Sequence, residues 1–558
     1  MVARTSRETL VATFCFVESK ISASSPDLGL AIRVSESSTR VPASPSGKMG
    51  SMADGRNRPR YADLYFGKSD SHNELIDDRG EFVRSFVNLG SIVEKVVSGS
   101  HTMVLGPKGT GKSALAWYLQ TTSAERDYFA RVKDASELPL ADIPRLETGQ
   151  PAGTERTVTA WRFILLCNYL DVALQDQSAR VPVESEVRRV TRHLRNYGLM
   201  GGTSGKAILS IAKTTIRIPI PKIGQIYSRE STPTLTIFAL LPYLEEWAAN
   251  IRSGNRHVLV LDGLDSIFLN DEKYDESMAA LVQAAYTINQ RFARTGSSGS
   301  IALLIRNDVF SRVSLTLPDS QKMRDDNAVE LDWRVLSGAR GAKAPLLKLV
   351  NEKAAKAAGL EDLDVLSYFP GSIEVGRRGS GGNPRHINTL QYLLNMTRHT
   401  PRDLLRLFEE IRRVEESGIF EPSRRGRLGQ DVIREGTIQY ANRYFTGAIR
   451  NEFAGFSGGP DQGQAALSAL QSLPSQLFDR SQFIGALRQL GYEEVGTADR
   501  LLRLLFFAGA IGNFVRRKDG QESYLQFYHR RDDADIYLKG ALTMHSALCH
   551  AWNIPFAT

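Results

Sequence analysis

The pattern of apolar and polar positions predicts that the first half of the chain alternates strands with amphipathic helices. Short, almost wholly apolar runs are typical of strands covered on both faces, and they occur at 101–105, 258–261 and 300–305. A further strand is predicted at 128–132. Apolar residues recur every three or four positions at 82–97, 159–174, 185–197, 235–252 and 344–357, which predicts helices there. This alternation favours an α/β fold with a parallel sheet between two helical layers.

The C-terminal part of the chain has a different pattern. Helices are predicted at 481–490 and 497–508, and strands at 511–515 and 524–528, with Asp519-Gly520 as a hairpin turn. Two helices followed by a hairpin predict a winged helix over 464–558, and the helical pattern of 341–463 predicts a lid. Within 206–227, an alternating segment with two prolines favours an edge hairpin or a loop.

The strand predicted at 101–105 leads into Gly-Pro-Lys-Gly-Thr-Gly-Lys-Ser, which fits the phosphate-loop pattern Gly-x4-Gly-Lys-Ser. Glycines let the backbone curl so that its N–H groups point at phosphate oxygens, and the following helix adds its positive N-terminal end. Lys112 is expected to reach the β and γ phosphates, and the Ser113 hydroxyl to bind Mg²⁺. The predicted nucleotide-binding residues are Gly106, Pro107, Lys108, Gly109, Thr110, Gly111, Lys112, Ser113 and Ala114.

A second motif, Val-Leu-Val-Leu-Asp-Gly-Leu-Asp, begins at Val258. A buried strand of this kind delivers Asp262 to its C-terminal end, beside the phosphate loop of a parallel sheet, where the carboxylate would hold Mg²⁺. Asp265 is the next acid and is predicted to orient or deprotonate the attacking water. Should it not, Glu245, Glu246 and Asp308 are the alternatives. The 150 residues between Lys112 and Asp262 require a helical insertion, placed at about 135–252.

Two arginines are predicted to stabilise charge on the γ-phosphate. Arg306 follows the strand predicted at 300–305, so its side chain is expected at the phosphate end of the sheet. Arg385 lies in Gly-Asn-Pro-Arg, and because proline suits a first helical turn, Arg385 is expected at the start of a lid helix that reaches back to the phosphates. Of the two, this context favours Arg385 as the catalytic arginine.

Together these motifs resemble the signalling and origin-recognition branches of the P-loop ATPases, and most closely a poorly characterised bacterial family of stand-alone P-loop ATPases. Tyr65-Phe66-Gly67, the helix around Trp161 and Trp333 fit the same pattern. The resemblance, over about 61–548, implies a parallel αβα sheet, a lid and a winged helix, with ATP and Mg²⁺ bound. In related signalling ATPases a second acid would follow Asp265, whereas this chain has Ser266.

Composition limits the remaining possibilities. The net charge is +8, and 377–450 holds 14 arginines against 8 acidic residues, which permits duplex DNA as a partner without requiring it. Three scattered cysteines and the lack of an apolar run near ~20 residues fit a cytoplasmic chain that does not span a membrane. Residues 1–60 are Ser-rich and predicted to be disordered, ahead of a P-loop domain at 61–340.

Three functions are consistent with these features. The leading one is an ATPase of low turnover that acts as a nucleotide-dependent switch, coupling ATP to the lid and the winged helix. The second is an ATP-regulated DNA-binding protein, and the third is an interaction scaffold that binds nucleotide with little turnover. The helix at 497–508 is unusually apolar for one that reads base edges, which favours a protein contact through the C-terminal domain. A homo-oligomer is a further candidate assembly.

Overall fold

The computed structural model describes residues 58–135, 154–196, 198–200, 237–264, 272–317, 319–333, 344–375, 385–421, 426–453, 459–515, 524–530 and 534–556. Contacts along the chain separate Met1–Arg58 from a compact unit formed by Pro59–Thr558, and the fold reported below is that of the second unit. Four features predicted above lie outside the described residues. They are the N-terminal extension up to residue 57, the extended segment within 206–227, the Asp519-Gly520 turn and Asp265.

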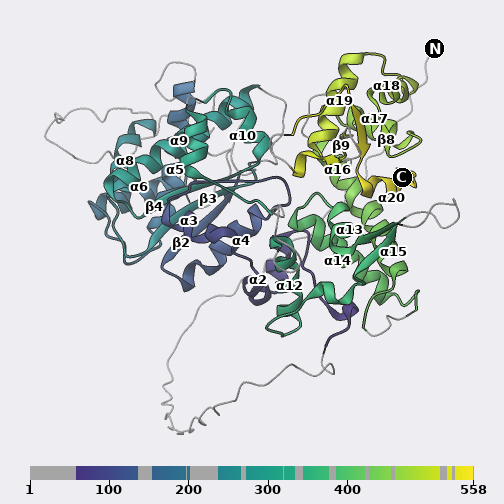
Figure 1. The fold of residues 1–558 in the computed structure, drawn as a ribbon. Coiled ribbons are helices and arrows are strands. Elements are labelled where there is room, and N and C mark those ends of the chain that lie inside the picture. Colours follow the sequence, from purple (N-terminus) through teal and green to yellow (C-terminus); the bar gives the residue numbers. More distant parts are fainter. Residues whose placement is uncertain are drawn as a thin grey trace, which may run out of the picture. The chain divides into compact units, whose positions relative to one another are not determined.

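A five-stranded sheet forms the centre of the first half of this unit (Figure 1). The strands lie in the order β2-β3-β4-β1-β5, and each neighbouring pair is parallel. Their bounds are β1 Met103–Leu105, β2 Tyr128–Asp134, β3 Arg256–Asp262, β4 Gly299–Ile305 and β5 Ala328–Glu330. Every residue of β4 is buried. The predicted mixed α/β fold with a parallel sheet is confirmed, and β5 is a strand that the pattern did not predict.

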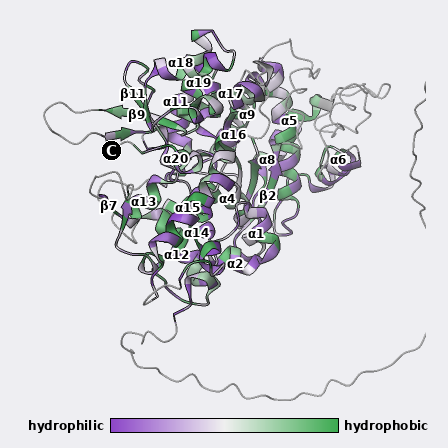
Figure 2. Ribbon diagram, turned by 90° about the vertical axis from the view of Figure 1, so that its right-hand side faces the viewer, coloured by the Kyte–Doolittle hydropathy of each residue, from purple (hydrophilic) through white to green (hydrophobic). Residues whose placement is uncertain are grey.

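Helices cover both faces of the sheet. Alternate residues of a strand point to opposite faces, and the apolar residues on each face of β4 pack against a different set of helices. Ile301 and Leu303 pack in one hydrophobic cluster with α5 (Thr154–Ala173), α8 (Leu241–Asn250) and α9 (Glu272–Thr295). Ala302 and Leu304 pack in another with α3 (Ile92–Ser98) and α4 (Lys112–Thr122). The half is completed by α1 Ser71–Asp77, α6 Glu184–Asn196, α10 Asn307–Val313, α11 Ser320–Asn327 and the short turns η3 Ser123–Glu125 and η6 Ile237–Leu240. A further short turn, η1 Tyr61–Asp63, precedes them in the chain. Hydrophilic residues dominate α6 (Figure 2).

The single helix predicted over 82–97 is wrong. The structure has α2 (Arg79–Arg84) and α3 on either side of a turn, η2 (Leu89–Ser91). Gly90 and Ser91 both have left-handed backbone, with φ of 57° and 56°, and two successive left-handed residues cannot continue a right-handed helix. The Asn88 side chain accepts a hydrogen bond from the backbone N–H of Val93, which fixes the start of α3.

The region between the sheet and the C-terminal part is mainly helical. Its elements are α12 Pro345–Ala357, η8 Val365–Tyr368, β6 Ser372–Val375, β7 Arg385–Asn388, α13 Thr389–Asn395, α14 Pro401–Glu416, α15 Gln430–Tyr440, the π-helix η9 Ala441–Phe445 and α16 Thr446–Phe453. We call this region the lid.

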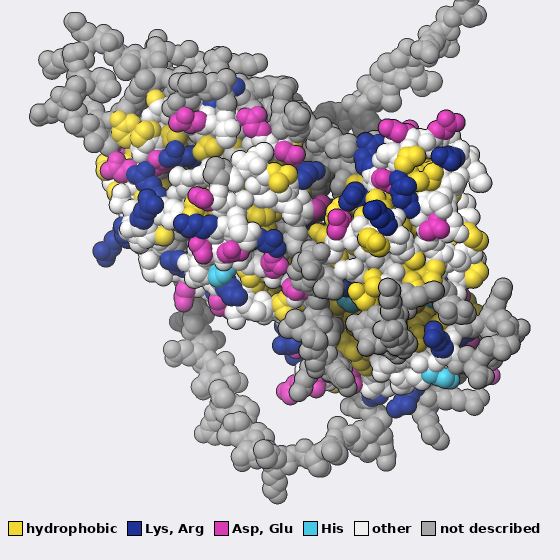
Figure 3. All heavy atoms as spheres, turned by 45° about the horizontal axis from the view of Figure 1, so that its top comes forward, with side chains coloured by type: hydrophobic (Ala, Val, Ile, Leu, Met, Phe, Trp, Pro, Cys, Tyr) yellow, Lys and Arg dark blue, Asp and Glu magenta, His cyan; other side chains and the backbone are white. Residues whose placement is uncertain are grey.

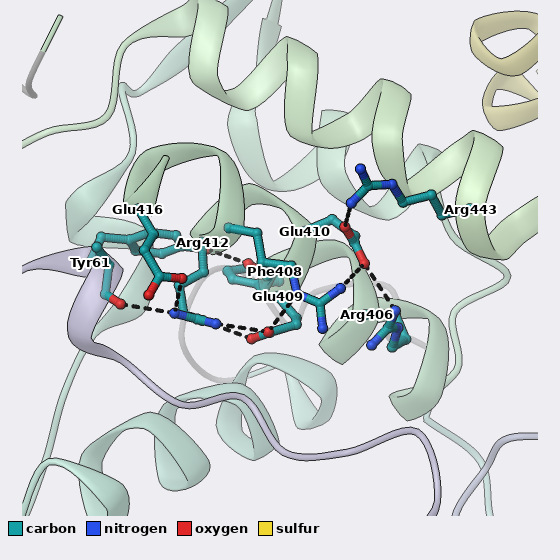
Figure 4. A network of polar contacts seen from close by, with 10 residues as sticks. Tyr61, Arg406, Phe408, Glu409, Glu410, Arg412, Glu416 and Arg443 are labelled. Atoms are coloured by element: carbon teal, nitrogen blue, oxygen red, sulfur yellow. Dashed lines mark hydrogen bonds and ion pairs between the residues drawn. The ribbon is translucent and has the colours of Figure 1, made fainter. Parts of the chain in front are cut away.

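A polar network ties the start of the described chain to α14 (Figure 4). The Tyr61 hydroxyl donates to the Phe408 carbonyl at 3.1 Å, and Arg412 donates to the Ala62 carbonyl at 3.1 Å. Arg412 also pairs with Glu409 and Glu416, each at 2.9 Å. Tyr61 therefore packs in the core of the lid and not against the parallel sheet.

The C-terminal part places two helices before an antiparallel hairpin, in the predicted order. Its elements are α17 Gly459–Gln471, β8 Leu477–Phe478, α18 Arg480–Gln489, α19 Val495–Phe507, β9 Ile511–Val515, β10 Tyr524–Gln526, η10 Tyr528–Arg530, β11 Ala541–Met544 and α20 Ser546–Trp552. The strand order is β10-β9-β11-β8, so two further strands join the hairpin. That the C-terminal part is a winged helix stays a prediction. One hydrophobic cluster continues from the lid into this part. The domain boundary at residue 464 stays a prediction.

Candidate nucleotide site

The phosphate-loop sequence lies between a strand and a helix, as its motif requires. β1 ends at Leu105 and α4 begins at Lys112. Gly109 and Gly111 have φ of 83° and 97°, in the left-handed region that favours glycine. A Cβ on Gly106 would lie 2.7 Å from the Thr110 hydroxyl. These three glycines are therefore needed for the tight curl of the loop.

Contacts from outside the loop hold it in this shape. The Trp333 indole N–H donates to the Thr110 carbonyl at 2.8 Å, and the Arg402 backbone N–H, at the start of α14, donates to the Gly109 carbonyl at 3.2 Å. Lys112 is buried and its ammonium donates to the carbonyls of Gly106 and Pro107, at 2.9 and 3.0 Å. The lid thus contacts the loop directly.

A cavity of about 510 Å³ opens in front of the loop, a volume typical of small-molecule sites. Loop and helix residues from Lys108 to Leu115 line one end, and these include Ser113 and Ala114. Gly106 and Pro107 line a second, smaller cavity behind the loop. Apolar side chains from α2, α3, the segment between them and the lid also line the main cavity: Phe82, Phe86, Val87, Ile92, Leu349 and Leu405.

A buried ion pair lies in the wall of the main cavity. The Lys353 ammonium on α12 pairs with the Glu74 carboxylate on α1 and donates to the Ser85 hydroxyl at 3.4 Å. All three residues line the cavity. A cavity lined both by the phosphate-loop sequence and by apolar side chains offers contacts for phosphates and for a base.

Carboxylates reach the cavity from the ends of two neighbouring strands. Asp262 ends β3 and Asp134 ends β2, and the two residues are register partners in the sheet. Both line the cavity. β4 lies between β3 and β1, so the strand that carries Asp262 is not adjacent to the strand that leads into the loop. The pattern missed Asp134, since the predicted strand at 128–132 stopped two residues before it.

The three acids named as alternatives to Asp265 lie in different places, and Glu246 is exposed on α8. Glu245 on α8 pairs with Arg162 and, at 2.8 Å, with Arg291, and it lines a different, small cavity. Asp308 does line the main cavity, but it accepts two hydrogen bonds from Arg306, at 2.8 and 2.9 Å.

Arg306 lies where the sequence predicted it, after β4 and on the wall of the cavity. Its side chain is only 11% exposed, and it pairs with Glu452 on α16 at 2.9 Å. Glu452 also pairs with Arg398 at 3.4 Å, and Arg398 makes a two-bond pair with Asp403, at 2.9 and 3.0 Å. Burial alone would raise the pKa of the Asp403 carboxyl, but the guanidinium of Arg398 holds it below its usual value. A chain of charges therefore runs from the sheet into the lid.

The predicted helical position of Arg385 is wrong. Arg385 is the first residue of β7 and pairs with Val375 of β6, and the helix begins four residues later, where the Asn388 side chain caps it. Arg385 is exposed and is not among the described residues that line the cavity. The arginine that the lid does bring to the cavity is Arg402, in the first turn of α14.

The residues present fit a magnesium nucleotide. Mg²⁺ is usually held by one or two carboxylates together with phosphate oxygens and water, and Ser113 and Asp262 supply oxygen ligands of this kind. Among the described residues, no group of three or more His, Cys, Asp or Glu side chains is arranged to hold a metal ion by itself. Any ion at this site would therefore depend on the phosphates for part of its coordination.

The second cavity, of about 110 Å³, joins the back of the loop to the C-terminal part. Trp333 and Pro107 face it from the loop side, and Phe507, Tyr528 and His529 face it from α19 and η10. The end of α19 thus lies directly behind the phosphate loop.

Many described arginines of the arginine-rich stretch pair with acidic side chains, whereas Arg385, Arg427 and Arg450 are exposed. Arg406, Arg412, Arg413, Arg434 and Arg443 each pair with an acidic side chain, and Arg398 is buried in the network above. Figure 3 shows basic and acidic side chains interspersed on the face that it presents. On α19, Arg503 pairs with Asp535 at 3.5 Å. Among the helices of the described residues, none is both long and apolar enough to cross a membrane.

Comparison with known proteins adds little to this geometry. No family model and no curated protein matches the chain. One solved structure, the crystal structure of Cdc6p from Pyrobaculum aerophilum, is 11% identical to it, covering 83% of this chain and 92% of that one at a TM-score of 0.28. The function proposed below therefore rests on the site itself.

Proposed function

We propose that the chain binds ATP·Mg²⁺ in the main cavity, hydrolyses it slowly, and uses the nucleotide state as a switch. The observation that carries the proposal is the meeting of four features in one cavity: a phosphate loop, Asp262 at a strand end, Arg306 from the sheet and Arg402 from the lid.

Each feature has a chemical task in this proposal. The loop N–H groups and Lys112 bind the β and γ phosphates, while Ser113 and Asp262 hold Mg²⁺, which would neutralise phosphate charge. Arg306 and Arg402 stabilise the charge that develops during transfer of the γ-phosphoryl group to water. Asp265 stays a candidate for the residue that orients the water.

The contacts of the loop support a switch. Arg402 donates to the loop through its backbone N–H, lines the cavity, and donates from Nε to the Ser69 carbonyl at 3.0 Å, so a phosphate bound there would act on the start of α14. Arg306 is held by Glu452 of α16, and a γ-phosphate would compete with that carboxylate for the guanidinium. Both routes lead from the nucleotide into the lid, which shares its core with the C-terminal part.

The two rival functions differ in what they require. An ATP-regulated DNA-binding protein needs an open basic face, and the ion pairs of Arg406, Arg413 and Arg443 reduce the free positive charge in 385–450. A nucleotide-binding scaffold for protein partners or for a second copy needs the same cavity without turnover.

A steady-state ATPase assay with and without duplex DNA separates these functions. The switch predicts slow phosphate release that DNA leaves unchanged. Stimulation by DNA together with salt-sensitive DNA binding would favour the second function. Tight ATP binding without phosphate release would favour the third.

A further inference from the structure

The space beside Asp262 is filled by a side chain from another strand. The residue after Asp262 is Gly263, with φ of 73°. A Cβ built on Gly263 would lie 2.8 Å from the Asp134 Oδ1 atom and 3.2 Å from its Cγ atom. The Asp134 carboxylate therefore occupies the position into which a side chain at residue 263 would project.

The two carboxylates are held at one edge of the sheet. Asp134 and Asp262 are register partners at the ends of parallel strands, and neighbouring strands lie only ~4.8 Å apart. Both face the cavity that contains Lys112 and Arg306. Asp134 is exposed whereas Asp262 is half-buried, so Asp134 is the more accessible of the two to water.

We infer that Asp134 is a catalytic carboxylate, orienting and deprotonating the water that attacks the γ-phosphate. This inference rests on the proposed ATPase function. A side chain at residue 263 would push the Asp134 carboxylate from this position. In the division of roles that we infer, Asp262 holds the metal and Asp134 acts on the water.

The chemical step balances with the groups in the cavity. The water oxygen forms a bond to the γ-phosphorus, and the bond from that phosphorus to the β,γ-bridging oxygen breaks. The bridging oxygen keeps the electron pair and leaves on ADP, while the water proton passes to the Asp134 carboxylate. Arg306, on the same cavity wall, is placed to stabilise the charge on the phosphoryl oxygens.

The test is Asp134→Asn, compared with Asp127→Asn as a matched control. Asp127 is also exposed and lies just before β2, at the opposite end of the strand from the cavity. Three quantities are measured for each protein: the affinity for a fluorescent ATP analogue with and without Mg²⁺, the single-turnover rate of ATP hydrolysis, and the thermal midpoint. Asp265→Asn is measured in parallel.

The inference expects Asp134→Asn to keep the thermal midpoint and the affinity for ATP·Mg²⁺ while its single-turnover rate falls by ~10²-fold or more, the usual loss for a general base. The Asp127→Asn control should match the wild type. An unchanged rate in Asp134→Asn overturns the inference alone. Loss of Mg²⁺-dependent affinity would overturn it in favour of a metal ligand, and a lower midpoint in favour of a structural role. A wild-type chain that binds no ATP would refute the proposed function as well.

Discussion

Glu452 is the residue whose removal tests most sharply how the sheet and the lid are joined. Its carboxylate, 7% exposed, accepts from Arg306 at 2.9 Å and from Arg398 at 3.4 Å. Glu452→Gln keeps the shape and one acceptor oxygen but removes the charge. Each arginine retains another carboxylate, so neither is left as an unpaired buried charge, the situation that costs about 3–5 kcal/mol.

The expected loss of stability is therefore smaller. A hydrogen bond to a charged group contributes roughly 1.5–3 kcal/mol, and the weakening of one short and one long bond of this kind should cost about 2 kcal/mol. At roughly 2 °C per kcal/mol for a large domain, the thermal midpoint should fall by about 4 °C. The matched control is Glu416→Gln on α14, because Glu416 is 60% exposed and its pair with Arg412 should contribute at most about 0.5 kcal/mol.

Nucleotide binding provides an independent measurement on the same variant. Glu452 lines the cavity and competes with a γ-phosphate for Arg306, so Glu452→Gln should raise the affinity for ATP more than that for ADP. Differential scanning fluorimetry and a titration with both nucleotides test the two effects. Equal midpoints in the two variants, together with an unchanged ratio of ATP to ADP affinity, would refute the proposed coupling.

Three further predictions follow from particular contacts. Arg402→Ala should lower ATP affinity by about tenfold or more, the effect of losing one charge-assisted hydrogen bond, while Arg385→Ala should not change it in the same titration. Gly436→Ala would place a Cβ 2.6 Å from the backbone of α14 and should lower the free energy of unfolding by about 1–3 kcal/mol. Gly447→Ala, with open space around it, should raise that free energy by about 0.5–1 kcal/mol, and equal thermal midpoints of the two variants would contradict this packing. Burial lowers the pKa of His545 from 6.5 to about 3, so between these pH values the unfolded chain binds a proton that the folded chain does not bind. As the pH is lowered through this range, the free energy of unfolding should decrease by roughly 1.4 kcal/mol per pH unit relative to that of His545→Asn, measured in parallel denaturation curves.

Local patterns predicted the parts of the site that are built from neighbouring residues. The phosphate loop needs only a strand, glycines and a helix in succession, and all of them lie between Met103 and Thr122. The strand that ends at Asp262 was visible because parallel strands buried on both faces are apolar throughout. The apolar run of β2 is interrupted by Arg131 and Lys133, so the sequence pattern did not extend the predicted strand to Asp134.

The remaining residues of the site come from long-range contacts that no local pattern encodes. Glu452 meets Arg306 across 146 positions, and Arg402 reaches the loop only because α14 packs beside it. For Arg385, the preceding proline favoured a helix start, but pairing between β6 and β7 overrides that local preference. The phosphate-loop motif could be identified from the sequence, whereas the lid residues that line the cavity could be identified only from the three-dimensional structure.

The central claim, that the cavity binds a magnesium nucleotide through Lys112, is tested most directly by isothermal titration of ATP into the wild-type chain and Lys112→Ala, with Mg²⁺ present. The Lys112 ammonium donates to two carbonyls of the loop, so its charge lies within the loop. We expect saturable binding of one ATP per chain in the wild type and its loss in a Lys112→Ala protein that still unfolds cooperatively in the absence of nucleotide. Equal ATP affinity in the two proteins, or no binding by the wild type, would contradict the account.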